Sequence, residues 1–510
     1  MKASLRIDVL LACMALAGIG HGALAQAAEV RDTTVRPLVP APQTLTPAKG
    51  ELYFRTVSVQ AQGSAPKARQ ALDAALYALG IPTNGSGSGN GTGSATVRLQ
   101  LIDDPALGEE GYRLVIGEDI TLSARTDTGL LHAVQTLRQL LPARPQRELR
   151  LPRLSIADAP AYRWRGVSLD VARSFLPMAY LERHIDRMAL FKLNRLHLHL
   201  TDDQGWRIQI NGYPKLTEIG GGSAVEGGRA GFYTQDELKH LVAYAQARGV
   251  TIVPEIDMPG HVQAALASYN TLACDNVTNL APYSGVEVGF SVLCLEKPEA
   301  IYPFVQAVLE QVVAIFPSTE IHIGGDEIKH PLYADFVSRA AAIVDGMGRT
   351  PIVWEEGSVA TLKPNALLQL WNDGYDIAPA VAKGHPLILS PCSYLYVDHG
   401  NHAGQPGADW CRKEGLPLQR VYQFDPAPFK TAVGIEAALW TEFVHTDADT
   451  DARLWPRLAA VAELAWSPAG TRDYAGFVQR LDGLRPQLDA LGVQYYAEPD
   501  LGWNAPAKHK

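Results

Sequence analysis

Hydrophobic residues in most of the chain occur in short runs that alternate with longer stretches of helical apolar spacing. From about Tyr162 onward, each apolar run is followed by a turn and then by a helix-like segment. This order is typical of β/α units, in which parallel strands are covered by helices. Eight strands of this kind are predicted, and eight is the number that closes a β/α barrel. They are residues 167–171, 195–200, 251–256, 320–324, 351–354, 367–371, 387–391 and 434–439.

Helical periodicity is clearest between and after these strands, and a different pattern precedes them. Apolar positions recur at helical spacing in five segments: 178–191, 234–248, 300–315, 455–464 and 477–491. Upstream, alternating strand-like segments at 56–59, 95–101 and 112–116 combine with a helical segment at 128–141. The pattern therefore predicts a small α/β domain over residues 26–157 and a (β/α)8 TIM barrel over residues 158–510.

The segment from Asn84 to Ser94 consists almost entirely of Gly, Ser, Asn and Thr, which predicts a flexible loop. It lacks the Gly-Lys-Ser/Thr ending of a phosphate-binding loop, so that interpretation is rejected. Asn84 and Asn90 in this region, with Asn276, begin glycosylation sequons, which matter only in a host that glycosylates.

The first 25 residues have the pattern of a secretory signal peptide. Lys2 and Arg6 precede an apolar run from Val9 to about Gly18, and the small-residue site Ala23-Leu24-Ala25 follows. The run is shorter than the roughly 20 residues that a membrane-spanning helix needs, which disfavours an anchor. Lipoprotein processing at Cys13 is disfavoured as well, since its motif matches only loosely. We expect export, to the periplasm or the outside of the cell, with no membrane span.

Composition describes an ordinary globular protein of mildly acidic charge. Hydrophobic residues make up 47% of the chain, charged residues 19%, and the formal net charge is −9. An acidic surface repels phosphate backbones, and the only basic run is the tail at Lys508 to Lys510, so we expect no nucleic-acid partner. Nothing in the pattern predicts an oligomeric state.

Four cysteines remain after the signal: Cys274 and Cys294, and Cys392 and Cys411, separated by 20 and 19 residues. Pairing within each set is the economical connectivity, and export to an oxidising compartment favours disulfides. The alternative is a zinc site, which lacks both a C-x-x-C element and a histidine in ligand register. We expect two disulfides, no metal and no cofactor.

Polar and aromatic residues gather where all eight predicted barrel strands end, which is where active sites form in this fold. In chain order they are Asp170 and Arg173; Asp202 and Asp203; Glu255, Asp257 and His261; Asp326 and Glu327; Trp354, Glu355 and Glu356; Trp371, Asn372 and Asp373; Tyr396 and Asp398; Trp440 and Glu442. Singly, a buried Trp is usually core and a strand-end Asp often caps a helix. Their coincidence at eight ends instead favours a sugar site, because acids transfer protons and aromatic faces pack on sugar rings.

The stretch His322-Ile323-Gly324-Gly325-Asp326-Glu327 resembles the H-x-G-G-D-E motif of glycoside hydrolase family 20, the β-N-acetylhexosaminidases. Other segments match as well: Arg165-Gly166 with 169–173, then 197–206, 254–261, 354–356 and 439–442. The likeness covers nearly the whole mature chain, because this family also has a small α/β domain before its barrel. It implies an exo-acting enzyme that removes terminal β-linked N-acetylhexosamine from oligosaccharides or glycoconjugates.

The resemblance also implies a mechanism in which the substrate's own acetamido oxygen attacks the anomeric carbon and forms an oxazolinium intermediate with net retention. Glu327 would be the general acid and base, Asp326 would hold the acetamido group, and Asp202 and His261 would tune Glu327. Consecutive residues on an extended strand point to opposite faces, which makes an adjacent Asp-Glu pair an odd acid and nucleophile pair.

The substrate contacts implied by the resemblance are of two kinds. Arg173, Asp398 and Glu442 would bind ring hydroxyls. Tyr396 would bond the acetamido oxygen, with Trp354, Trp371 and Trp440 as walls of the pocket. The sequence departs from the family at Thr441, where glycine is usual, and Tyr394 competes with Tyr396 for the tyrosine's role.

Two other functions remain open at this point. One is a conventional retaining glycosidase with Glu327 as acid and Glu355 or Asp257 as nucleophile. The other is a non-catalytic glycan-binding barrel, although such a protein would normally have lost an acid. Preference between gluco and galacto sugars depends on side-chain placement, and chitin fragments, glycoprotein glycans and cell-wall pieces all end in suitable sugars.

Overall fold

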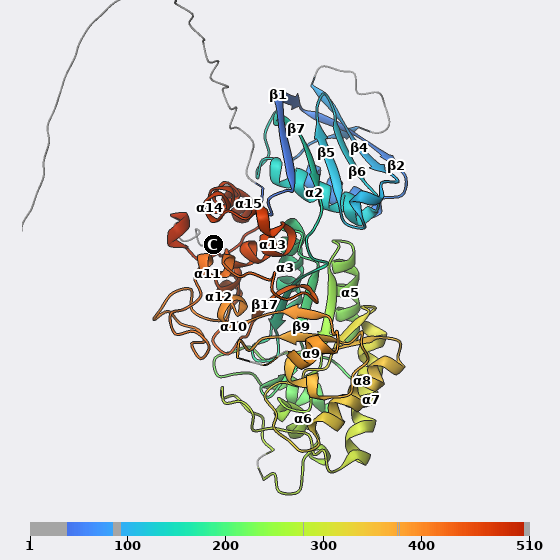
Figure 1. Ribbon diagram of the computed structural model, residues 1–510, viewed down its shortest axis with the longest axis vertical. Coiled ribbons are helices and arrows are strands. Elements are labelled where there is room, and N and C mark those ends of the chain that lie inside the picture. The colour runs from blue at the N-terminus through green and yellow to red at the C-terminus, as the bar shows by residue number, and fades with distance from the viewer. Residues whose placement is uncertain (1–37, 85–92, 279, 375, 377, 504–510) are drawn as a thin grey trace, which may run out of the picture. The chain divides into compact units, whose positions relative to one another are not determined.

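Eight parallel strands close into a barrel, which confirms the predicted fold class (Figure 1). The computed structural model describes residues 38–84, 93–278, 280–374, 376 and 378–503. The strand order around the barrel is β12-β13-β14-β15-β16-β17-β8-β9. The strands are β8 (Trp164–Asp170), β9 (Arg195–His199), β12 (Thr251–Glu255), β13 (Glu320–His322), β14 (Thr350–Trp354), β15 (Leu367–Leu370), β16 (Leu387–Leu389) and β17 (Ala432–Leu439). Each lies within two or three residues of its predicted segment.

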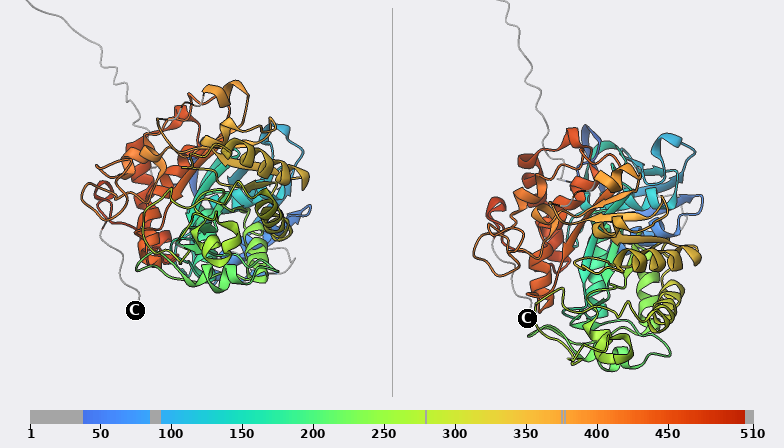
Figure 2. Two further views of the ribbon diagram at one scale, coloured as in Figure 1. Left: turned by 90° about the horizontal axis from the view of Figure 1, so that it is seen from below. Right: turned by 60° about the horizontal axis from the view of Figure 1, so that its bottom comes forward.

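Helices cover the outside of the barrel. Figure 2 shows the green-to-yellow helices of its first half and the orange-to-red helices of its second half on different sides. The longer helices are α3 (Met178–Leu190), α5 (Gln235–Gln246), α7 (Pro298–Ile315), α8 (Tyr333–Gly346), α12 (Asp447–Leu454), α13 (Arg457–Trp466) and α14 (Tyr474–Gly483). The shorter ones are α4 (Lys215–Glu218), α6 (Gln263–Ser268), α9 (Ala378–Ala382), α10 (Cys392–Leu395), α11 (Leu418–Tyr422) and α15 (Arg485–Ala490). A two-stranded ribbon of β10 (Thr201–Asp202) and β11 (Gly205–Trp206) follows β9.

The single helix expected at 477–491 is two helices, α14 and α15, with a break at Leu484. Pro486 lies in the first turn of α15. A proline has no amide hydrogen to donate, so Pro486 cannot make the backbone hydrogen bond that would continue α14. The apolar periodicity nevertheless runs on across this break.

The barrel interior is apolar at one end and charged toward the carboxyl ends of the strands. The apolar layer consists of Trp164, Val253, Ile352, Leu367 and Ile388. Val253 and Glu255 are two residues apart on β12, so their side chains face the same side. Glu255 therefore enters the interior above the apolar layer, where it is fully buried. The charged layer lies directly beneath the strand ends.

A seven-stranded mixed sheet precedes the barrel, with the order β1-β7-β5-β6-β4-β2-β3 among the described residues. Its strands are β1 (Thr44–Phe54), β2 (Thr56–Gln62), β3 (Thr83–Asn84), β4 (Ser94–Leu101), β5 (Tyr112–Ile116), β6 (Ile120–Ala124) and β7 (Leu149–Asp158). Helix α2 (Asp127–Leu140) packs against β4, β5 and β6, and α1 (Pro66–Ala78) packs against α2. The first barrel strand begins six residues after the sheet ends.

Both expected disulfides are present, Cys274–Cys294 and Cys392–Cys411. Each closes a local loop, as the spacing predicts. The expected signal peptide, most of the Gly-rich tract with Asn90, and the basic tail lie outside the described residues. Among the residues that the structure does describe, no helix is long and apolar enough to cross a membrane.

A buried polar cluster around Asp158 joins the sheet to the barrel. The Tyr112 hydroxyl and the Trp466 indole N–H donate to the Asp158 carboxylate over 2.7 and 2.9 Å. The Lys192 ammonium lies 3.3 Å from the same oxygen. Lys192 and Asp158 are both about 2% exposed. Because a buried cation that loses its carboxylate is costly, this pair couples the stability of the two domains.

We therefore expect Asp158→Asn to lower the free energy of unfolding by about 3 kcal/mol, since it leaves the Lys192 charge buried without a counter-ion. Denaturant unfolding followed by circular dichroism measures this loss. The control is Asp103→Asn, a change at an exposed aspartate. Equal stability of the two variants would show that the cluster does not hold the domains together.

Candidate active site

A cavity of about 430 Å³ opens where the barrel strands end. Charged and aromatic side chains from several strand-end loops line it. They are Arg173, His261, Asp326, Glu327, Trp371, Tyr396, Asp398, Asp409, Trp410, Trp440 and Glu442, with Val286, Val288, Gly407, Ala408 and Phe443. Nine of these were singled out from the sequence as candidate site residues, so residues from distant parts of the chain meet as the β/α pattern predicts.

The loop after β13 carries both central acids. Strand β13 ends at His322, so Asp326 and Glu327 lie in a loop and not in extended chain. Glu327 has φ of +59°, a left-handed backbone that few non-glycine residues adopt. Both carboxylates line the cavity. The premise that the two acids lie on extended backbone is therefore wrong, whereas their placement at one site agrees with the roles that the resemblance implies.

Two glycines make this loop possible. Gly324 and Gly325 have φ of +67° and +104°. A Cβ atom on Gly324 would lie 1.7 Å from Oδ1 of Asp257, closer than any non-bonded contact. The Gly325 N–H donates to the same Oδ1 over 3.2 Å. The close approach of backbone and carboxylate fixes the position from which Asp326 and Glu327 extend.

His261 lies between the two acids and Asp202. Its Nε2 is 3.6 Å from Asp326 and 3.4 Å from Glu327, and its Nδ1 is 3.5 Å from Asp202. Burial disfavours the charged ring, but Asp202 and Asp326 outweigh this and raise the pKa of His261 well above its ordinary value. An imidazolium at this position is in contact with all three carboxylates.

Asp326 is a mostly buried carboxyl whose pKa is raised above its ordinary value. Burial raises its pKa to about 6, the His261 cation opposes this shift, and the charge of Glu327 adds to it. The Glu327 side chain is about one-third exposed and faces the open part of the cavity. The two neighbours therefore differ in solvation, which suits them to different tasks.

Arg173 also lines the cavity and is buried among carboxylates. Its guanidinium lies 2.9 Å from Asp202, 3.6 Å from Asp170 and 3.6 Å from Glu442. Burial disfavours its charge, yet these neighbours raise the pKa of Arg173 well above its ordinary value. Burial raises the pKa of Glu442 to about 7, and the cation of Arg173 opposes that shift. This pair presents donors and acceptors side by side.

Aromatic rings form a continuous wall. Trp371 stacks on Tyr396 with ring centres 6.3 Å apart, and Tyr396 lies edge to face with Trp440 at 6.1 Å. Trp410 meets both Trp371 and Tyr396 at 5.7 and 5.9 Å. Trp354 does not line this cavity. It is buried behind Trp440, with its ring centre 6.1 Å away.

Asp398 is buried, yet no described residue donates a hydrogen bond to its carboxylate oxygens. Nδ1 of the His399 ring lies 3.6 Å from the carboxylate. Asp398 also lines the cavity. Because a buried acceptor without a partner is costly, it is suited to receive hydroxyl hydrogens from a ligand.

The acids at the end of β14 serve as supports. Glu355 accepts the backbone N–H groups of Trp371 and Asn372, each over 3.0 Å, and burial raises its pKa to about 8. Glu356 accepts from the Trp371 indole over 3.2 Å. Neither Glu355 nor Asp257, the two alternative nucleophiles, lines the cavity.

Sequence reasoning missed residues on the cavity rim, of which Trp410, Val286, Val288 and Phe443 have large exposed apolar side chains. They lie in irregular loops, where no periodic pattern marks them. For Trp410 one signal was available, since it immediately precedes Cys411, whose disulfide fixes the end of that loop.

Comparison with known proteins identifies this arrangement. A family model described as glycosyl hydrolase family 20, catalytic domain, matches residues 162–335 and 329–469, and domain 2 of the same family matches residues 35–159. The chain belongs to glycosyl hydrolase family 20. A β-N-acetylhexosaminidase from Cellulomonas fimi is 39% identical over 426 residues, which is 81% of this chain and 85% of the relative.

Solved family 20 structures agree. A Streptomyces plicatus N-acetyl-β-hexosaminidase in complex with Thio-NAglucal has a TM-score of 0.85 and 38% identity, covering 93% of this chain and 99% of that one. A mutant of the same enzyme was solved with product (GlcNAc), again with a TM-score of 0.85 and 38% identity, covering 92% of this chain and 99% of that one. The chain is thus a glycosidase of the β-N-acetylhexosaminidase type, and substrate-assisted catalysis is characteristic of its family.

Clusters with metal-like spacing also occur in this family 20 site, among them His199, Asp202 and Asp257. Both ring nitrogens of His199 already face carboxylates of the protein. Asp202 is bonded to His199 and paired with Arg173. The atoms of His199 and Asp202 that could bind a metal are thus already engaged by other protein groups. The cluster therefore works as a hydrogen-bonded network.

We expect Gly324→Ala to lower kcat/KM at least tenfold and to destabilise the fold, because the new methyl group displaces Asp257 and with it the loop of Asp326 and Glu327. Gly348→Ala is the matched control, since Gly348 has φ of +73° but open space around it. The control should cost about 1 kcal/mol of backbone strain and no activity. Equal activity in both variants would contradict the role given to the close contact.

Proposed function

We propose that this enzyme removes terminal β-linked N-acetylhexosamine with Glu327 as general acid and base and Asp326 as the residue that holds the acetamido group. The supporting observation is that both carboxylates enter one cavity and lie within 3.6 Å of the same imidazole. Asp326 is mostly buried, while Glu327 is open enough to reach a leaving group.

In the first step the acetamido carbonyl oxygen forms a bond to the anomeric carbon while the glycosidic C–O bond breaks. Glu327 gives its proton to the departing oxygen, and Asp326 accepts a hydrogen bond from the acetamido N–H. In the second step Glu327 takes a proton from water, whose oxygen attacks the anomeric carbon and opens the oxazolinium ring. The leaving group departs from the face on which water later enters, and the acetamido oxygen bonds on the opposite face, so two inversions give net retention.

A conventional nucleophile is disfavoured by the same geometry. The alternative carboxylates Glu355 and Asp257 lie outside the cavity lining. Glu355 is occupied by two backbone donors, and the Asp257 carboxylate accepts the Gly325 N–H. We infer that neither of these two carboxylates is placed to act as the nucleophile at the anomeric carbon.

The remaining cavity residues would bind the sugar ring. Arg173 and Glu442 offer donors and acceptors to hydroxyl groups, and the unpartnered oxygens of Asp398 accept from others. Trp371 and Trp440 supply flat apolar surfaces, and Tyr396 supplies a phenol beside them. Trp354 supports Trp440 from behind and does not itself form the wall.

We also propose export of the enzyme. The first 25 residues have the charge, apolar run and cleavage site of a signal peptide. The disulfides Cys274–Cys294 and Cys392–Cys411 support an oxidising compartment, because such bonds persist outside the cytosol. Periplasmic or extracellular glycans ending in N-acetylhexosamine would then be the substrates.

Glu327→Gln should lower kcat on phenyl N-acetyl-β-glucosaminide by about 10²–10⁴-fold, because the poor leaving group needs a proton. Affinity for N-acetylglucosamine, measured by calorimetry, should stay within a few-fold of wild type. Near-normal turnover on the phenyl substrate would remove Glu327 from its role.

The activity should depend on ionised Asp326. Since its pKa is about 6 in the free enzyme, log kcat/KM should fall as pH drops through 6, where protonation removes the acceptor for the acetamido N–H. Asp326→Asn should abolish this limb, reduce kcat/KM at pH 7 and weaken thiazoline inhibitors, which mimic the cyclised intermediate.

The control for Asp326→Asn is Asp236→Asn, a change at a surface aspartate, which should keep the wild-type profile. An acid limb that persists in Asp326→Asn would assign that ionisation to another group. Unchanged thiazoline inhibition would separate Asp326 from the acetamido group.

A further inference from the structure

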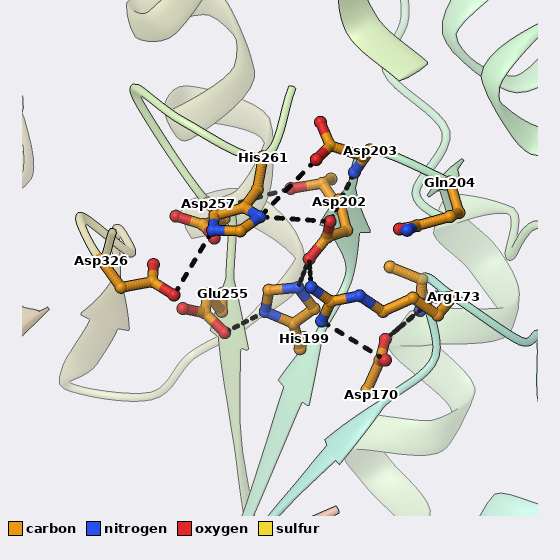
Figure 3. Close-up of polar contacts among 12 residues, drawn as sticks. Asp170, Arg173, His199, Asp202, Asp203, Gln204, Glu255, Asp257, His261 and Asp326 are labelled. Carbon is orange, nitrogen blue, oxygen red and sulfur yellow. Dashed lines mark hydrogen bonds and ion pairs between the residues drawn. The ribbon is translucent and has the colours of Figure 1, made fainter. Parts of the chain in front are cut away.

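A layer of buried charge beneath the cavity contacts the catalytic residues but not the cavity itself. Figure 3 shows His199 between Glu255 and Asp202, and His261 between Asp202 and Asp326. His199 and Glu255 are at most 1% exposed, and neither lines the cavity. Burying ionisable groups is costly unless they are paired. The partners of each buried group therefore indicate the role of this layer.

His199 bridges two carboxylates. Its Nδ1 is 2.5 Å from Oε2 of Glu255, and its Nε2 is 2.7 Å from Oδ2 of Asp202. A neutral imidazole has one donor nitrogen and one acceptor nitrogen, whereas ionised carboxylates only accept. Both ring nitrogens must therefore carry hydrogens, and His199 is a buried imidazolium. Burial opposes this charge, while Glu255 and Asp202 raise the pKa of His199 well above its ordinary value.

Asp202 is held on each of its oxygens. Oδ2 faces His199 and, at 2.9 Å, the guanidinium of Arg173. Oδ1 accepts the Asp203 N–H over 2.6 Å and faces Nδ1 of His261 at 3.5 Å. The contact with His261 therefore depends on how firmly the other oxygen is held, and His199 holds it from below.

Glu255 connects this layer to the acetamido side of the pocket. Its Oε1 accepts the Trp354 indole N–H over 2.9 Å, and Trp354 packs behind Trp440. Its Oε2 lies 3.1 Å from Nε2 of His197, in addition to its bond to His199. One carboxylate thus orients both the histidine below Asp202 and the indole behind the aromatic wall.

We infer that His199 and Glu255 are positioning residues, which fix Asp202 so that His261 presents its Nε2 to Glu327. The chain of contacts is Glu255, His199, Asp202, His261 and Glu327. The inference rests on the proposed role of Glu327. It extends that role to a second buried imidazole that touches neither substrate nor reacting atoms.

The test compares substrates with different leaving groups. A 2,4-dinitrophenyl group departs without a proton, whereas a phenyl group needs the general acid. His199→Phe keeps the flat ring beside Trp440 but loses both donors. It should lower kcat on phenyl N-acetyl-β-glucosaminide about 30-fold or more, and on the dinitrophenyl substrate less than about 3-fold, since general-acid catalysis is worth about 10²–10⁴.

A uniform loss on both substrates, or no loss on either, would overturn the inference, because a merely structural residue would not discriminate between leaving groups. His184→Phe is the matched control. His184 is fully buried, and within the described part of the chain neither of its ring nitrogens has a hydrogen-bond partner. This control should leave the ratio of the two kcat values unchanged.

Glu255→Gln is a second variant that tests the same inference if His199→Phe does not fold. Thermal unfolding shows whether each variant folds. It should produce the same leaving-group discrimination and should also weaken thiazoline inhibition, through Trp354. Retention of wild-type values for both readouts would contradict the inference. Glu327→Gln shows whether a negative result concerns the positioning role or the proposed function. If Glu327→Gln loses no more activity on the phenyl substrate than on the dinitrophenyl substrate, the proposed function itself fails. If Glu327→Gln discriminates between the two substrates but His199→Phe does not, only the positioning role fails.

Discussion

The site depends on one constraint, that no buried charge beneath the cavity can be left without a partner. Asp202 meets this constraint with His199, Arg173 and the ring of His261. Each of these is in turn balanced by another carboxylate, such as Glu255 or Glu442. Because removing one member exposes the others to uncompensated desolvation, the members of the network stabilise one another in the observed arrangement. That arrangement places a cationic imidazole beside two cavity carboxylates.

The backbone of the loop after β13, which carries Asp326 and Glu327, depends on a close approach between backbone and carboxylate. Asp257 can accept the Gly325 N–H only because Gly324 has no Cβ in its path. The loop then turns through left-handed conformations, and Glu327 adopts one as well. Strain of this kind persists only where the surroundings over-determine it. Here the fixed loop brings two adjacent side chains to one cavity, which extended chain would have separated.

The fold was predictable because each barrel strand is a short apolar run between turn and helix, a pattern that burial imposes locally. Predicted and observed strands differ by no more than three residues at either end. The rim was not predictable. Trp410 and Val286 lie in irregular loops, where tertiary contacts alone decide what reaches the cavity. The break at Leu484 and the orientation of Asp326 escaped for a related reason, since periodicity carries no information about a single backbone dihedral angle.

The proposed function gives two adjacent acids different tasks, and one histidine faces both of them. Nε2 of His261 is at nearly the same distance from Asp326 and Glu327. A cation at that point attracts a negative charge on either side chain. In the proposed mechanism Glu327 becomes negatively charged when it gives its proton to the leaving group. That charge repels the charge of Asp326, and the imidazolium of His261 offsets the repulsion. The repulsion between the two carboxylates is therefore offset by a firmly held histidine and not by a large distance between them.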